Sequence, residues 1–150
     1  MTAKQLALRT LNRTTDYLKE HFDRVPPERL DDSPGGSAPS LRWVIQHLID
    51  CEGWWLVNFG AEPPKPPFAA REPEDADAAA LWAVFAEARQ HVLGVLEGLD
   101  DEFFETHPES AHYDPTWTGA ELCFYIGEHD FHHAGEMAML EQVWEEREVG

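Results

Sequence analysis

The spacing of apolar residues, broken by proline-rich segments, constrains the fold of this chain more than any other feature. In the first segment, apolar residues recur at offsets of three, seven and four, which predicts a helix with one apolar stripe over residues 3–24. The stripe consists of Leu8, Leu11, Leu18 and Phe22. Pro26 and Pro27 end this helix, and the proline, glycine and aspartate content of residues 25–39 predicts a linker.

A second helix is predicted over residues 40–59, with Ser40 as its N-cap. Its large side chains are Trp43, Val44, His47, Leu48, Cys51, Trp54 and Trp55. The following residues 60–75 contain five prolines and cannot be helical, because proline has no backbone N–H to donate. We interpret this long, stiff connection as a crossover along the side of a bundle, and not as a tight antiparallel turn.

A third helix is predicted over residues 76–99. Its apolar face consists of Leu81, Phe85, Val92, Leu96 and Leu99. Residues 100–115 are expected to be mostly loop, and a fourth helix is expected to run from a capping box at Thr118 and Glu121 to about residue 146. Four helices, without a convincing strand or an internal repeat, predict an all-α four-helix bundle that residues 1–150 form as one domain.

The charge of the chain limits its partners. The net charge is −18, and the 11 Lys and Arg residues form no run, so no face can neutralise a row of phosphates. We therefore exclude nucleic acid and anionic membranes. No apolar run has the length of a membrane span and the N-terminus lacks the apolar core of a signal peptide, so we expect a soluble cytoplasmic protein. In that setting we interpret Cys51 and Cys123 as buried thiols, and not as a disulfide.

Three histidines lie close together in residues 128–136, which read EHDFHHAGE. His129 and His133 are four residues apart, so on a helix they lie about 40° apart and one turn along the axis, and both imidazoles can reach one ion. His132 is rotated from His133 by about 100° and is expected to point away from that ion. Glu136 continues the stripe of His129 and His133.

His47 supplies a third imidazole from another helix. It lies one turn after Trp43 and one turn before Cys51, neighbours that place it toward the interior of the bundle. Three imidazoles with positions left open are the pattern of a catalytic metal site, and not of a closed structural one. Two other interpretations also fit: the pair on the fourth helix forms a solvated polar face, and His47 is a core histidine bonded to a backbone carbonyl. The residues interpreted as solvent-exposed are His21, His91, His107, His112, Glu128 and Asp130.

Two segments resemble the DinB-like (YfiT-like) superfamily of metalloenzymes: PSLRWVIQHLIDCEGWW at residues 39–55 and TGAELCFYIGEHDFHHAGEMAML at residues 118–140. Together with the helix count and the crossover, the resemblance covers nearly the whole chain. The more specific motif is a histidine, three residues on a His-His pair, then a small or basic residue, Gly and usually Gln. On that pattern His47, His129 and His133 match the metal ligands, while Ala134 and Glu136 depart from the usual Arg and Gln without removing a ligand.

The resemblance implies a bundle that binds a divalent metal ion, zinc or nickel, usually as a homodimer. Relatives include transferases and isomerases that use a low-molecular-weight thiol. We therefore expect a metal-dependent enzyme acting on a small molecule, either a thiol-dependent transferase or a hydrolase, in which the metal activates a thiol or water. The alternative is a non-catalytic, stress-related dimer that binds a metal or ligand.

Several roles at the expected site stay open. Glu136 is our candidate catalytic residue, as a general base, although it also suits a fourth ligand or a group that orients a ligand; Asp50 and Glu52 are weaker candidates for the base. We expect the second ring nitrogen of each ligand to be held by a carboxylate, a carbonyl or water. The aromatic side chains either wall an apolar pocket or belong to the core, and for Trp54 and Trp55 we favour the core.

Overall fold

All four segments with helical spacing form helices in the computed structural model, which describes residues 1–149. The long helices are α1 (Ala3–Arg24), α2 (Leu41–Asn58), α3 (Ala78–Gly98) and α5 (Gly119–Val149). The connections contain the short helix α4 (Asp101–Glu105) and the 3-10 helices η1 (Pro27–Arg29) and η2 (Phe68–Arg71). Residues 1–149 contain no strand, so the predicted all-α fold is confirmed.

Side-chain caps explain where the helices begin. The side chain of Ser40 accepts a hydrogen bond from the backbone N–H of Trp43, which confirms the predicted N-cap of α2. At the start of α5, the backbone N–H of Thr118 donates to Glu121 at 2.7 Å and the N–H of Glu121 donates back to the Thr118 hydroxyl at 3.3 Å. This reciprocal pair is the predicted capping box.

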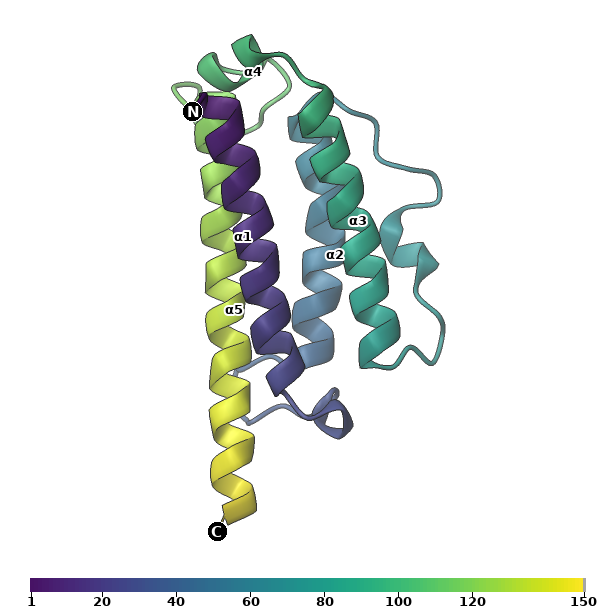
Figure 1. The fold of residues 1–150 in the computed structure, drawn as a ribbon. Coiled ribbons are helices and arrows are strands. Elements are labelled where there is room, and N and C mark those ends of the chain that lie inside the picture. Colours follow the sequence, from purple (N-terminus) through teal and green to yellow (C-terminus); the bar gives the residue numbers. More distant parts are fainter. Residues whose placement is uncertain (150) are drawn as a thin grey trace.

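The long helices are arranged as two parallel pairs that run in opposite directions (Figure 1). α1 and α5 run in the same direction, because Thr14 contacts Asp130 and, further toward the C-terminal ends of both helices, Arg24 lies beside Glu141. α2 and α3 form the second pair. Parallel neighbours require a connection that returns the full length of a helix, and residues 59–77 make that return along the outer side of α3, as the predicted crossover does.

The short helix α4 is an element that the apolar spacing does not predict. Asp100 caps it by accepting from the backbone N–H of Phe103 at 3.0 Å, and Phe104 is buried. α4 packs tightly on the start of α5, where a Cβ on Gly119 would lie 2.4 Å from the backbone oxygen of Phe103. Glycine is therefore required at that point by space alone.

A buried charged cluster joins the four long helices. Its centre is Arg89 of α3, 1% exposed, whose guanidinium donates to Glu52 of α2, Asp130 of α5 and Thr15 of α1 at distances between 2.7 and 3.1 Å. Both carboxylates are fully buried, and Thr14 donates a further hydrogen bond of 2.6 Å to Asp130. The prediction that Asp130 lies on a solvated face is therefore wrong, because Arg89 supplies a buried counter-charge.

Two further predictions are wrong, one of burial and one of exposure. Trp54 is 46% exposed and donates to the Tyr113 hydroxyl, so it does not belong to the core, whereas Trp55 is buried as expected. His21 is buried against the ring of Tyr17 instead of lying on the surface. Within residues 1–149, no helix has an apolar stretch long enough to cross a membrane.

Candidate metal centre

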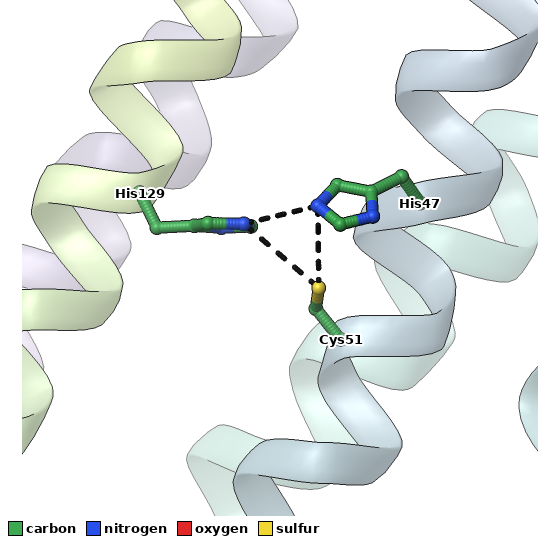
Figure 2. Close-up of side chains that lie close together, drawn as sticks. All are labelled: His47, Cys51 and His129. Atoms are coloured by element: carbon green, nitrogen blue, oxygen red, sulfur yellow. Dashed lines mark hydrogen bonds between the residues drawn. The ribbon is translucent and has the colours of Figure 1, made fainter. Parts of the chain in front are cut away.

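Three imidazoles converge between α2 and α5. His47 projects from α2, and His129 and His133 project from successive turns of α5. The Nε2 atom of His129 lies 3.2 Å from the Nε2 atom of His47 and 3.2 Å from that of His133. The structure thus brings the three predicted ligand residues together, with the same ring atom of each directed inward. Figure 2 shows His47 and His129 facing one another across the space between the two helices.

His132 and Glu136 lie at the outer edge of this cluster. The side chain of His132 is 69% exposed, and its Nε2 atom is 3.6 Å from a carboxylate oxygen of Glu136. His132, His133 and Glu136 also form a group whose donor atoms lie within 4.8 Å of one another, but only His133 in that group is buried. The more enclosed convergence on His129 is therefore the better candidate for a metal centre.

Glu136 contacts the outer nitrogen of His133. Its carboxylate lies 2.6 Å from Nδ1, so Nδ1–H donates to Glu136 and the lone pair of Nε2 is left free to bind an ion. Of the three roles left open for Glu136, this contact favours the orientation of a ligand. The buried Nδ1 of His129 has no protein partner among residues 1–149, so of the expected carboxylate, carbonyl or water, water is the group left to hold it.

The two imidazoles of α5 are held in the neutral form that binds metals. Burial lowers the pKa of His129 from 6.5 to about 4, with the nearby rings of His133 and His47 adding to the shift and Asp130 opposing it. Burial also lowers the pKa of His133, although its hydrogen bond to Glu136 acts in the opposite direction. Near neutral pH these rings therefore keep a lone pair for a cation.

Cys51 is a member of the cluster that the histidine motif does not include. Its Sγ atom lies 3.6 Å from Nε2 of His47 and 3.8 Å from Nε2 of His129 (Figure 2). Both cysteines are free thiols as predicted, but only Cys123 is buried, and Cys51 is half-buried. The signal that places Cys51 here is its spacing of four from His47, the same spacing that pairs His129 with His133. Burial raises the pKa of Cys51 to about 12, and the carboxylates of Glu52 and Asp50 add to the shift.

The distances between the donors fit a divalent transition metal. In a tetrahedral zinc site an imidazole nitrogen is about 2.0–2.1 Å from the metal, so two such nitrogens are about 3.3 Å apart. The two Nε2–Nε2 distances of 3.2 Å agree with that separation. Neutral imidazoles are also the nitrogen ligands that suit zinc and nickel.

Comparison with models of known protein families identifies the family of this chain. The model that describes the DinB superfamily matches residues 10–137, a range that includes every residue of the cluster. The chain belongs to the DinB superfamily. A crystal structure described as the conserved protein of locus from Enterococcus faecalis is similar to it, with a TM-score of 0.56 and 13% identity over 95% of this chain and 97% of that chain. At that identity the likeness concerns the fold alone. A search among curated proteins finds no match.

In this DinB superfamily chain, aromatic rings border the cluster on two sides. Trp43 stacks on His47 with ring centroids 5.0 Å apart and planes 7° apart, and Trp55 packs edge-on against His129 at 5.6 Å. The exposed Trp43 and Glu136 also line a hollow of about 520 Å³, whose remaining wall comes from residues 31–40. The three histidines do not line this hollow; it adjoins the cluster through Trp43, which stacks on His47, and through Glu136, which contacts His133.

Proposed function

We propose that this chain binds one divalent transition-metal ion through His47, His129 and His133, and that it uses the ion to catalyse a reaction on a small molecule. The observation that carries the proposal is the convergence of three imidazoles from two helices, with Nε2 of His129 lying 3.2 Å from Nε2 of His47 and 3.2 Å from Nε2 of His133. Imidazole donors and these separations support zinc or nickel. Membership of the DinB superfamily supports a site at these positions.

A divalent ion held by these imidazoles would keep its charge and would lower the pKa of a bound thiol or water, and so would supply a nucleophile near neutral pH. The residues of the chain divide the remaining tasks. Glu136 fixes the ring of His133 and lines the hollow, so we assign it the acceptance of a proton from a molecule there; Asp31 also lines the hollow but is paired with Arg42. Glu52 does not suit that role, because it is buried and bonded to Arg89.

The reaction that we propose is transfer or hydrolysis with a low-molecular-weight thiol or water as the nucleophile. The hollow beside Trp43 supports a small substrate, since its volume of about 520 Å³ is in the range of small-molecule sites. The net charge of −18 makes nucleic acid an unsuitable substrate.

We further propose that the protein is a homodimer. Large apolar side chains are exposed on the adjacent helices α1 and α5, where Tyr17 and Phe131 pack edge-on with ring centroids 5.4 Å apart. Among the residues of these helices whose side chains the structure describes, Leu6, Phe124 and Met139 are also large, apolar and exposed. Sedimentation of the wild type and of Phe131→Glu tests this: we expect a dimer that the charged substitution dissociates, and a wild-type monomer at micromolar concentration would contradict it.

One observation favours a second candidate function, a metal-binding protein without turnover. The Cys51 sulfur lies 3.6 Å and 3.8 Å from two of the three imidazole donors, and a metal bound by it as well as by the histidines would have the closed set of four protein donors that is typical of sites without catalysis. Full metal occupancy, with no turnover of small thiol or amide substrates, would support this second function against the first.

Metal analysis of protein purified without a histidine tag tests the shared part of both proposals. We expect about one zinc or nickel ion per chain, strongly reduced by His47→Ala, His129→Ala or His133→Ala. His132→Ala is the matched control, because His132 is adjacent in sequence but exposed. If His132→Ala abolished binding and His133→Ala did not, the assignment of ligands would be wrong. A parallel screen of small thiol substrates tests catalysis.

A further inference from the structure

We propose that Cys51 is a fourth protein donor to the metal ion, bound as a thiolate. The inference rests on the metal site proposed above and does not depend on whether that site turns over a substrate. It assigns a role to a residue outside the three-histidine motif, and it changes which metals the site prefers and what a substrate must do to reach the ion.

The position of Cys51 follows from the way the two helices face each other. α2 supplies His47 and Cys51 from successive turns, and α5 supplies His129 and His133 from successive turns. His47 and Cys51 thus present their donors on the same side of α2, where Nε2 of His129 lies 3.2 Å from the His47 nitrogen and 3.8 Å from the sulfur; His133 joins this group through His129, at 3.2 Å. Figure 2 shows the Cys51 sulfur next to the inward-facing ring nitrogens of His47 and His129.

The distances match a nitrogen–sulfur edge of a tetrahedral site. With about 2.0–2.1 Å from the metal to imidazole nitrogen and about 2.3 Å to thiolate sulfur, a nitrogen and a sulfur are about 3.6 Å apart. The Cys51 sulfur lies 3.6 Å from Nε2 of His47 and 3.8 Å from Nε2 of His129, while those two nitrogens are 3.2 Å apart. The three atoms thus form one face of such a site.

The charges around the Cys51 sulfur favour the protonated thiol, since burial and the carboxylates of Glu52, Asp50 and Asp130 outweigh the opposing charge of Arg89. The buried guanidinium of Arg89 is bonded to Glu52 and Asp130, and the residues that flank Cys51 are the carboxylates Asp50 and Glu52. A divalent ion supplies the missing positive charge: the S–H bond breaks, the sulfur electron pair forms the bond to the metal, and the proton leaves to solvent. Cys51 is therefore expected to bind only together with a metal.

A thiolate donor has two consequences for the site. Sulfur favours zinc, cobalt and nickel over magnesium, calcium and manganese, which prefer oxygen ligands. It also fills the position that three histidines leave open, so a substrate must displace the Cys51 sulfur or enter as a fifth ligand. Excess Mg²⁺ should consequently leave Co²⁺ binding unchanged.

Titration of the metal-free full-length chain with Co²⁺ tests the inference, because a cobalt–thiolate bond has a charge-transfer band in the near ultraviolet. We expect one equivalent of Co²⁺ to produce the band in the wild type. Cys123→Ala should keep it, since Cys123 is buried elsewhere on α5 and is the only other cysteine. Cys51→Ala should bind one Co²⁺ without the band and should release one proton fewer per ion than the wild type.

The outcomes separate this inference from the proposed function. One bound Co²⁺ without the band in the wild type would overturn the role of Cys51 and leave the histidine site standing. No Co²⁺ binding by the wild type, or binding unaffected by His129→Ala, would overturn both. If Cys51→Ala does not fold, Cys51→Ser replaces it. Cys123→Ala decides separately which cysteine binds the metal: loss of the charge-transfer band in Cys123→Ala would contradict the proposal.

Discussion

Replacement of Arg89 by methionine should cost more stability than any surface substitution in the protein. Methionine roughly keeps the volume of the side chain, so the change removes the charge without opening a large cavity. The loss follows from the contacts of Arg89, which is 1% exposed and pairs with two carboxylates that are 0% exposed. Removal of one partner from a buried ion pair costs about 3–5 kcal/mol, because the other charge stays buried without compensation.

The magnitude lies at the upper end of that range, since one substitution leaves both Glu52 and Asp130 without a counter-charge. We expect a loss of about 5 kcal/mol, against a total free energy of unfolding of about 5–15 kcal/mol for a domain. Arg24→Ala is the matched control, because Arg24 forms an exposed pair with Glu20. That change should cost less than about 1 kcal/mol.

Urea unfolding followed by circular dichroism measures both variants, at about pH 8 and at about pH 5. Burial already raises the pKa of Glu52, and protonation of Glu52 removes its uncompensated charge, so the loss in Arg89→Met should be smaller at the lower pH. A loss of equal size at both pH values would show that packing, and not buried charge, is responsible. An unfolding midpoint equal to that of the wild type would refute the role of the cluster in stability.

Three further predictions concern the site and the helix contacts. Burial lowers the pKa of His129 from 6.5 to about 4, so between these pH values the unfolded chain binds a proton that the folded chain does not. Urea unfolding of the metal-free protein should therefore show that the free energy of unfolding falls as pH falls from 6.5 to about 4. A constant free energy of unfolding would contradict the burial of this ring. Glu136→Ala should weaken metal affinity about 10–100-fold, measured by competition with a chelating indicator. Glu136→Gln should weaken it less, because the glutamine side chain still accepts a hydrogen bond from Nδ1–H of His133. Equal effects of the two substitutions would show that the charge, and not the hydrogen bond, matters. Gly119→Ala should lower the free energy of unfolding by about 1–3 kcal/mol, because the added methyl group clashes with Phe103. Gly135→Ala has open space at its Cβ and should stabilise α5 by up to about 1 kcal/mol. If thermal unfolding ranked the two variants in the opposite order, the close approach of α4 to α5 would be refuted.

The sequence predicts the long helices well because their signals are local. Ser40, Thr118 and the proline-rich segments set boundaries that the structure reproduces within a few residues. α4 escapes prediction since five residues are too few to show a periodic pattern. The spacing of His129 and His133 predicts that the two rings share a face of the helix, but the partner of that face comes from α2, which the DinB resemblance indicates and the spacing alone does not.

Long-range pairing explains what the sequence does not reveal. Asp130 reads as a solvated residue because a charged side chain on a helix usually faces water, and its burial depends on Arg89, 41 residues away. The sequence alone predicts Cys51 to be a core thiol, because its contact with the donor atom of His129 spans 78 residues and has no local signal. Trp54 reads as core because it is large and apolar, yet it borders a loop through Tyr113 instead of another long helix.

The parallel pairing of α1 with α5 has a consequence for how the protein emerges during synthesis. Thr14 contacts Asp130 across 116 residues, and at about 5–20 residues per second the ribosome needs roughly 6–23 s to make the chain between them. Throughout that interval the apolar stripe of α1 has been made but the helix that covers it has not. The same late helix delivers His129 and His133, so an unfinished chain both exposes an apolar surface and lacks half of the candidate metal donors.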